Sequence, residues 1–270
     1  MMELFRLDFF LNAFLTSCIL AALFGMLSFF VVMRKMSFLG AGVAHTAFGG
    51  VALGVLTGLN PFLTSFAFCI LAAVLIGKLV RHGRVSYDMG IGIFFSFSMA
   101  LGAIFLSFRE GYAFDLSSYL FGNILAVTRT DVIIALAVLA LFAPFIFIFV
   151  HRILFMTMDD EVATVSGVRT GLLDTVLLVF LAGIIVISIK IVGIILVSAL
   201  VVLPAGFGLL VSRNYRTVIL AGILFTAAVM IGGLFLSYLL DTPAGATMVA
   251  AGTLLYFASL LSFRKALPGR

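Results

Sequence analysis

The sequence predicts an all-α, polytopic membrane protein, and its low charge content and long apolar runs are the observations that lead there. Hydrophobic residues make up 64% of the 270 positions and charged residues only 10%, and the mean hydropathy is +1.34. A soluble domain carries about 25% charged residues, because its surface must stay hydrated. This chain has too few charges to cover a surface in water, so lipid must be its main solvent.

The apolar residues come in runs of about 20, the length of a helix that crosses a hydrocarbon layer about 30 Å thick. A membrane β-barrel would instead show alternating segments of about ten residues, and the sequence has none. Because Lys190 leaves little room between the sixth and seventh runs, the pattern allows eight to ten spans. The nine predicted spans are 9–33, 36–58, 61–80, 88–108, 131–150, 171–189, 192–212, 217–239 and 246–263.

The distribution of Lys and Arg predicts the orientation of these spans. With nine spans and the N-terminus outside, twelve basic residues fall on one side and four on the other. Cytoplasmic loops carry the excess of Lys and Arg, so the N-terminus is expected outside and the C-terminus in the cytoplasm. The net charge of +5 is explained by this topology, and it gives no support to a nucleic-acid partner. The cytoplasmic group is Arg34, Lys35, Lys78, Arg81, Arg84, Arg152, Arg169, Arg213, Arg216, Arg264, Lys265 and Arg270.

The sequence contains no recognisable source of energy for transport. The phosphate-binding pattern G-x-x-x-x-G-K-[ST] is absent, so the chain is not predicted to be an ATPase, nor any other enzyme. Acidic residues fall in connections or at span ends, whereas carriers driven by ion gradients often use carboxylates within the membrane. We therefore expect any uphill transport to be driven by a partner chain.

The predicted cytoplasmic connection over residues 151–171 is a candidate docking loop for such a partner. Three acidic residues suit the N-terminal end of a short helix, and valines that follow give it an apolar edge. A solvated surface helix is the alternative interpretation of the same segment. The candidate coupling residues are Asp159, Asp160, Glu161, Val162, Val165, Gly167 and Arg169.

The predicted outer connection, residues 109–130, contains a second short amphipathic segment that begins at Asp115. An aspartate in this place can cap the first turn of a helix. Charge and predicted side make four residues candidates for docking an extracytoplasmic protein: Arg109, Glu110, Asp115 and Asp241.

His45 is the residue most suited to touch a substrate. It lies in a span rich in glycine, where small residues let helices approach closely, and neutral imidazole is a common metal ligand. The alternative is a histidine that is hydrogen-bonded within the helix packing. The glycines concerned are Gly42, Gly49, Gly50 and Gly54.

The run from Lys190 to Gly206 is apolar but contains residues that interrupt helices. Gly193, Ser198 and Pro204 are candidates for a break that lines a pathway, because freed backbone groups in a membrane need protein or water partners. A Pro-kinked helix within a bundle is the alternative.

Four stretches together resemble the permeases of the zinc, manganese and iron ABC importers, the ABC-3 family. Each stretch is similar to a characteristic segment of that family, and they occur in the family's order. The stretches are Arg34 to Gly54, Asp115 to Leu125, Ser188 to Ala205 and Ser237 to Thr247.

The resemblance implies a bundle like that of type II ABC importers, in the plasma (inner) membrane of a prokaryote. Two copies of one permease domain, residues 1–270, would form the pathway as a homodimer with ABC ATPase subunits, and an extracytoplasmic metal-binding protein would deliver the cation. The resemblance also implies that the loop at 151–171 couples to the ATPase. It implies a transported divalent metal rather than a permanently bound cofactor.

One position departs from the family pattern. The family often has an aspartate four residues before the histidine, and this chain has Ala41 there. A lone imidazole holds a divalent ion weakly and adds no negative charge. Permeases for cobalamin or iron-siderophore chelates, a carrier driven by an ion gradient and a structural membrane subunit therefore remain as alternatives.

Overall fold

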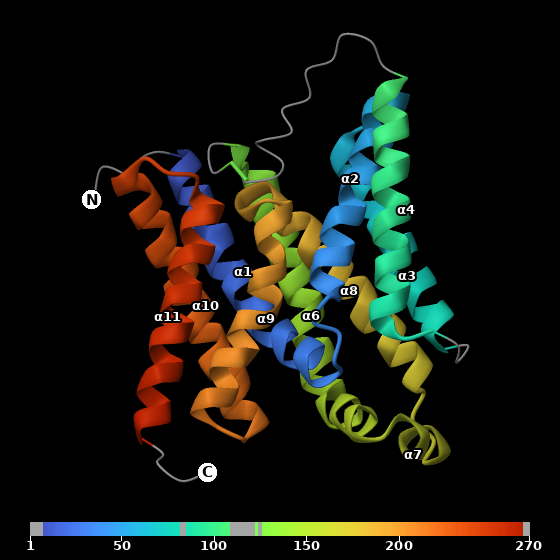
Figure 1. Ribbon diagram of the computed structural model, residues 1–270, viewed down its shortest axis with the longest axis vertical. Coiled ribbons are helices and arrows are strands. Elements are labelled where there is room, and N and C mark those ends of the chain that lie inside the picture. Colours follow the sequence, from blue (N-terminus) through green and yellow to red (C-terminus); the bar gives the residue numbers. More distant parts are fainter. Residues whose placement is uncertain (1–7, 82–84, 109–121, 124–125, 267–270) are drawn as a thin grey trace. The chain divides into compact units, whose positions relative to one another are not determined.

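The computed structural model describes residues 8–81, 85–108, 122–123 and 126–266, and the regular elements within these ranges are helices (Figure 1). Within the same ranges there is no strand, so the all-α prediction is confirmed. The helices are α1 (Asp8–Met33), α2 (Leu39–Thr57), α3 (Pro61–Arg81), α4 (Tyr87–Ser107), α6 (Arg129–Met158), α7 (Asp160–Val165), α8 (Thr170–Val192), α9 (Ile194–Val211), α10 (Tyr215–Leu240) and α11 (Ala244–Ala266).

Each of the nine predicted spans corresponds to one helix. Among the described residues, eight helices are long and apolar enough to cross a membrane, and α9 contributes a shorter apolar helix over Val197–Val211. This agrees with the predicted range of eight to ten spans. The polytopic architecture follows because a backbone in hydrocarbon must satisfy its hydrogen bonds within its own segment.

Two boundaries differ from the prediction. Helix α6 continues to Met158, eight residues past the expected end at position 150. The polar residues after position 150 end the apolar run but do not break the helix, and no helix stop signal precedes Asp159. Helix α8 runs through Lys190 to Val192, and a single residue, Gly193, separates it from α9. Hydropathy marks where the apolar run ends, whereas the helix ends where its backbone is broken.

The chain divides into two compact units. Unit 1 comprises Met1–Ser37, Ser117–Leu139 and Ser188–Arg270, and unit 2 comprises Phe38–Leu116 and Ala140–Ile187. Helices α6 and α8 therefore each contribute a segment to both units. Since neither unit is continuous in sequence, each is held together by packing between distant segments.

Unit 1 is built on α1, α9, α10 and α11, which pack through glycines. A Cβ atom on Gly25 of α1 would lie 2.5 Å from the Cα atom of Ile223 on α10, and one on Gly233 of α10 would lie 2.7 Å from the Cα atom of Met248 on α11. At these places the helix backbones touch. Glycine is required there because a side chain would push the helices apart.

Unit 2 has α2 packed against both α3 and α4. A Cβ atom on Gly49 would lie 2.7 Å from the carbonyl oxygen of Ser98 on α4, and one on Gly50 would lie 2.5 Å from the Cα atom of Ser65 on α3. Gly49 thus allows the close approach of α4, and Gly50 allows that of α3. The prediction that the small residues of this span permit close helix approach is confirmed.

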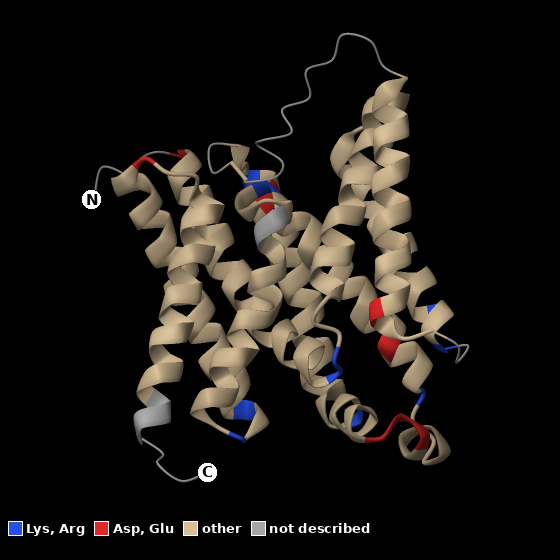
Figure 2. Cartoon of the chain, viewed as in Figure 1, with Lys and Arg blue, Asp and Glu red and all other residues tan. Residues whose placement is uncertain are grey.

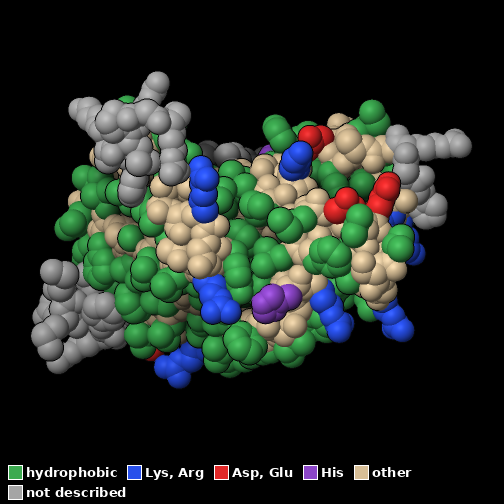
Figure 3. Space-filling model, turned by 90° about the horizontal axis from the view of Figure 1, so that it is seen from below, with side chains coloured by type: hydrophobic (Ala, Val, Ile, Leu, Met, Phe, Trp, Pro, Cys, Tyr) green, Lys and Arg blue, Asp and Glu red, His purple; other side chains and the backbone are tan. Residues whose placement is uncertain are grey.

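Charged residues lie towards the ends of the helices and in their connections (Figure 2). In unit 1, Arg34 and Lys35 follow α1, and Arg213 and Arg216 flank the α9–α10 connection at the same end. In unit 2, the basic residues Lys78, Arg81, Arg152 and Arg169 lie at the end where α3 stops and α8 starts. Seen from below, basic and acidic side chains reach the surface among hydrophobic ones (Figure 3).

Two adjacent glycines of α10 provide a matched test of this packing. We expect Gly233→Ala to lower the melting temperature of the detergent-purified protein, because overpacking a tight contact costs about 1–3 kcal/mol. A Cβ atom on Gly232 would meet no atom within 4 Å, so Gly232→Ala should leave the melting temperature unchanged or raise it through better helix propensity. Equal melting temperatures for the two variants would contradict the close packing of α10 on α11.

Candidate functional site

His45 lies on α2 in unit 2, at a pocket of about 540 Å³. The walls come from two helices, α2 and α4, which are packed face to face where Gly42 meets Ile91. The lining is mostly apolar, and its ionisable members are His45 and Asp88. The other lining residues are Phe38, Ala41, Gly42, Ile91, Gly92 and Phe95.

Two contacts fix the orientation of the His45 ring. Its Nδ1 atom lies 2.9 Å from the carbonyl oxygen of Ala41, one turn earlier in α2. Phe95 of α4 packs edge-on against the ring, with the ring centroids 4.9 Å apart. Because a carbonyl oxygen only accepts hydrogen bonds, Nδ1 must carry a proton, and in the matching neutral tautomer Nε2 is the acceptor. An imidazole held in this tautomer is arranged as metal-binding histidines are, with the other nitrogen bonded to a carbonyl.

Asp88 was missed in the sequence analysis because it stands at the start of a span and resembles an ordinary first-turn acid. Helices α2 and α4 are parallel, since Gly42 meets Ile91 and Gly49 meets Ser98. This register places Asp88 level with Leu39, six residues before His45, or about 9 Å along the helix axis. The two residues are therefore offset along the pocket rather than level with each other. They provide two separate polar positions along the pocket.

The spacing of the pocket residues on α4 could have revealed Asp88. Asp88, Ile91, Gly92 and Phe95 recur at the three- and four-residue intervals of one helical face. The sequence alone does not show that this face meets α2, because the register between two helices depends on their packing.

The candidate coupling segment forms the short helix α7 in unit 2. The side chain of Asp159 caps it by accepting a hydrogen bond from the backbone N–H of Val162 at 2.9 Å, and Gly167, with φ +86°, follows its end. Val165 is 90% exposed and Val162 is 50% exposed, while Ala163 is buried. The helix therefore turns an apolar edge outward beside the exposed acidic residues Asp160 and Glu161. Arg169, also exposed, lies just before α8.

The predicted helix break in the sixth and seventh spans lies at Gly193. This residue has φ +86° and ψ 160°, a conformation in which only glycine is comfortable. Pro204 lies inside α9 without ending it, and Ser198 is half-buried in the same helix. The break thus comes from the glycine alone.

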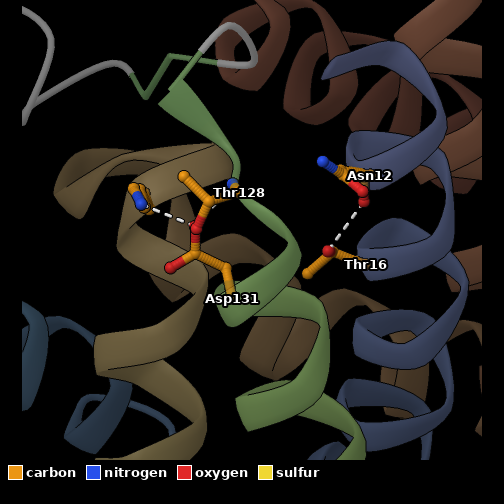
Figure 4. Close-up of polar contacts among 5 residues, drawn as sticks. Asn12, Thr16, Thr128 and Asp131 are labelled. Atoms are coloured by element: carbon orange, nitrogen blue, oxygen red, sulfur yellow. Dashed lines mark hydrogen bonds and ion pairs between the residues drawn. The ribbon is translucent and has the colours of Figure 1, made fainter. Parts of the chain in front are cut away.

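A network of polar groups in unit 1 surrounds the end of α8. The Lys190 ammonium lies 2.5 Å from the Oδ2 atom of Asp131 on α6, and the same oxygen accepts from the backbone N–H and the hydroxyl of Thr128, each at 2.7 Å (Figure 4). The backbone N–H of Asn123 donates to the Lys190 carbonyl at 2.9 Å. Lys190 is therefore neutralised by a partner 59 positions earlier, which no local pattern indicates.

The candidate docking residues are only partly described. Arg109, Glu110 and Asp115, with the predicted outer helix, lie outside the described residues. Asp241 ends α10 in a left-handed conformation, with φ +51°, at the edge of a pocket of about 320 Å³ in unit 1. Phe10, Ser237 and Tyr238 also line this pocket, which makes it an accessible concave surface at that end of the unit.

The described part of the chain holds no group of three or more His, Cys, Asp or Glu side chains placed to bind a metal ion. The pocket at His45 offers one imidazole and, further along, one carboxylate. Such a sparse set suits brief contact with a passing ion rather than tight retention.

The ABC 3 transport family matches residues 6–263 of the chain. The manganese transport system membrane protein MntC of Listeria innocua is 32% identical over 258 residues, which cover 96% of this chain and 92% of that protein. The high-affinity zinc uptake system membrane protein ZnuB of Haemophilus influenzae is 31% identical over 72% of this chain and 74% of its own length. Among solved structures, PsaBC from Streptococcus pneumoniae, in complex with a Fab, aligns with a TM-score of 0.82 and 30% identity over 95% of this chain and 92% of that one.

Substitution of Gly193 tests the break between α8 and α9. We expect Gly193→Ala to destabilise the protein by about 1–3 kcal/mol, because an L-residue is strained at this backbone conformation, and to lower its melting temperature in detergent. In the control variant Gly183→Ala the new methyl group would meet its nearest neighbour, Phe66, at 3.6 Å, an ordinary contact. If both variants melt like the unchanged protein, the backbone at position 193 is not fixed as described.

Proposed function

Because the chain belongs to the ABC 3 transport family, we propose that it is the membrane-spanning permease subunit of an ATP-binding-cassette importer for a divalent metal cation. The observation that carries the proposal is the family match over almost the whole chain, joined to a histidine with a free acceptor nitrogen in a pocket of the membrane body. Relatives named for manganese and zinc transport support those two ions, with iron as a further candidate.

The assembly we propose has two copies of the permease, two ABC ATPase chains and an extracytoplasmic metal-binding protein. The family match spans both compact units, which supports a single permease domain over residues 1–270. The sequence has no phosphate-binding loop, so ATP hydrolysis belongs to the partner chains rather than to this one. The remaining partner is membrane lipid; nucleic acid has no part in the proposal.

The proposed location is the plasma (inner) membrane of a prokaryote, with the basic ends of both units in the cytoplasm. Arg34, Lys35, Arg213 and Arg216 mark that end in unit 1. The two basic residues described at its opposite end are each paired with an acid, Arg129 with Asp8 and Lys190 with Asp131. The excess of positive charge at one end supports a cytoplasmic C-terminus and an outside N-terminus.

The pocket at His45 gives the pathway its chemistry. A cation that has shed part of its hydration shell can be held briefly by Nε2 of His45, a borderline ligand that suits zinc and iron, whereas manganese prefers oxygen ligands such as a carboxylate. Asp88, about 9 Å nearer the cytoplasmic end, then offers a negative charge on the exit side. Equivalent groups from the second copy would complete each set, which compensates for Ala41. Release of the cation remains fast because neither position surrounds it with a complete set of ligands.

The exposed apolar edge of α7 is the proposed contact with the ATPase. Val165 projects into solvent next to Asp160 and Glu161, and an apolar side chain flanked by charges fits a groove on a partner better than open water. Docking through α7 and the residues that flank it, Asp159 and Arg169, would let the closing ATPases move α7. On the outer side, the pocket edged by Asp241, together with Arg109, Glu110 and Asp115, would receive the binding protein.

Uptake into proteoliposomes tests the proposal directly. The permease reconstituted with its ATPase should take up manganese or zinc only when ATP is supplied, and His45→Ala should lower this uptake about tenfold or more, because even residues that only support a metal ligand are worth about that much. We expect Asp88→Asn to raise the cation concentration needed for half-maximal uptake. The measurement is uptake of the radioactive ion against time.

The matched control is His151→Ala, which removes a histidine of α6 that lies outside the pocket and should leave uptake unchanged. Uptake by the permease alone, driven by an ion gradient, would refute the ABC proposal in favour of a carrier. ATP-driven uptake of cobalamin or a siderophore chelate that does not depend on His45 would show that the transported substrate is a chelate rather than a free cation.

Charge on the apolar edge of α7 should break the contact with the ATPase. We expect Val165→Glu to lower ATP-driven uptake and the amount of ATPase that co-purifies with the permease, because the new carboxylate would have to be desolvated in the interface. Val165→Leu keeps the apolar character and should retain both. Val165 is exposed, so neither variant should alter the melting temperature of the permease. Full co-purification with Val165→Glu would show that α7 is not the docking helix.

A further inference from the structure

Within unit 2, the end of α3 is fastened to the start of α8 by one arginine. The Arg81 guanidinium donates to the Gly171 carbonyl oxygen and to the Thr175 hydroxyl, each at 2.5 Å, and to the Gly77 carbonyl oxygen at 3.2 Å. These bonds use three nitrogens of one planar group, so the side chain has a single usable orientation. The start of α8 is thereby tied to the last turn of α3.

A second tie joins the start of α4 to the same turn of α8. The Tyr87 hydroxyl donates to Oδ2 of Asp174, and the Asp174 side chain is almost fully buried, at 3% exposure. A hydrogen bond to a buried polar group matters more than one at the surface, because water cannot replace the lost partner. Removing such a bond is costly, because the carboxylate cannot regain water.

Close packing leaves little room for these helix ends to slide. A Cβ atom on Gly171 would lie 2.3 Å from a guanidinium nitrogen of Arg81, and one on Gly77 would lie 2.6 Å from Leu178. The ends of α3, α4 and α8 thus form one tight corner. A displacement of α8 at this corner must carry α3 and α4 with it.

The corner is also joined to α7. The backbone N–H of Val168 donates to the Ala163 carbonyl oxygen at 3.0 Å, and the hydroxyl groups of Thr164 and Thr170 are 2.9 Å apart. Only a few residues separate the end of α7 from Thr170, and these bonds fold them tightly. A push on α7 therefore reaches α8 without being absorbed by a loose connection.

The same corner borders the pocket at His45. Asp88, a lining residue of that pocket, follows Tyr87 directly in the chain, and α4 continues along the pocket through Ile91, Gly92 and Phe95. Phe95 is in turn the aromatic side chain against the His45 ring. One hydrogen-bonded route thus runs from α7, through the start of α8, to the α4 wall of the pocket, and all of it lies in unit 2.

We propose that Arg81, Tyr87, Asp174 and Thr175 are positioning residues, here called the α8 latch, which transmit the ATP-driven displacement of α7 to the wall of the cation pocket. The latch touches neither the cation nor the ATPase. This inference rests on the proposed function. It adds the physical link by which movement at the docking helix changes the surroundings of His45.

The test is the number of cations imported per ATP hydrolysed, measured on the reconstituted permease–ATPase complex with manganese as the ion. Tyr87→Phe removes the bond to Asp174, and Arg81→Lys cannot reach all three acceptors from one ammonium group. We expect each variant to hydrolyse ATP within about twofold of the unchanged complex and to import about five- to tenfold fewer ions per ATP, the range of ordinary coupling between two sites. Co-purification of the ATPase should not change.

The matched control is Arg216→Lys, because Arg216 is also exposed and donates to a tyrosine hydroxyl, that of Tyr215, but lies in unit 1. Its ratio of ions to ATP should equal that of the unchanged complex. Asp174→Asn keeps an acceptor for Tyr87 and should lose less coupling than Tyr87→Phe, and the fall in the ratio of ions to ATP is a readout that a merely structural role would not move. If Tyr87→Phe does not fold, Arg81→Lys decides the outcome.

An unchanged ratio of ions to ATP in the folded latch variants would overturn the latch while leaving the proposed function intact. A parallel fall in ATP hydrolysis and import, at constant ratio, would also overturn it, because the variants would then simply be less active. Absence of ATP-dependent import by the unchanged complex would instead refute the proposed function itself.

Discussion

The constraint on which the rest of the structure depends is that backbone polar groups in hydrocarbon must be bonded within the protein. It forces the spans to be helices and leaves side chains to decide how these helices meet. Lipid gives helices no hydrophobic reason to associate, so close backbone contact supplies much of the attraction. The glycines at positions 25, 49, 50 and 233 are the places where this contact occurs.

Charged side chains in a membrane-spanning structure are paired or hydrogen-bonded, because the low dielectric constant of hydrocarbon makes an unpaired charge costly. Lys190 and Asp131 neutralise each other near the ends of their helices, and Asp174 is buried but bonded to Tyr87. An ionisable group that stands in the membrane body without such a partner marks function. His45 fits this description, because its ring is oriented by Ala41 and Phe95 and leaves Nε2 as the acceptor in the tautomer that donates from Nδ1.

The proposed transport subunit needs a mechanical link between its contact with the ATPase and its substrate pocket. The two regions proposed for these roles, α7 and the pocket at His45, belong to one compact unit of the chain. The link between them consists of short, directional hydrogen bonds at a crowded helix corner. Such contacts transmit displacement well because packed groups have few alternative arrangements.

The sequence by itself determined the helical class, the number of spans to within one or two and the small-residue span around His45, and it offered Gly193 among three candidates for a helix break. These features are local, since they depend on apolar run length and on the conformational freedom of single residues. Only the tertiary structure decided that Asp88 shares a pocket with His45, that Lys190 meets Asp131, and that Arg81 reaches α8. These partners lie 43 to 94 positions apart in the chain. Their meeting depends on helix register, which is set by side-chain packing rather than by any periodicity that a single segment displays.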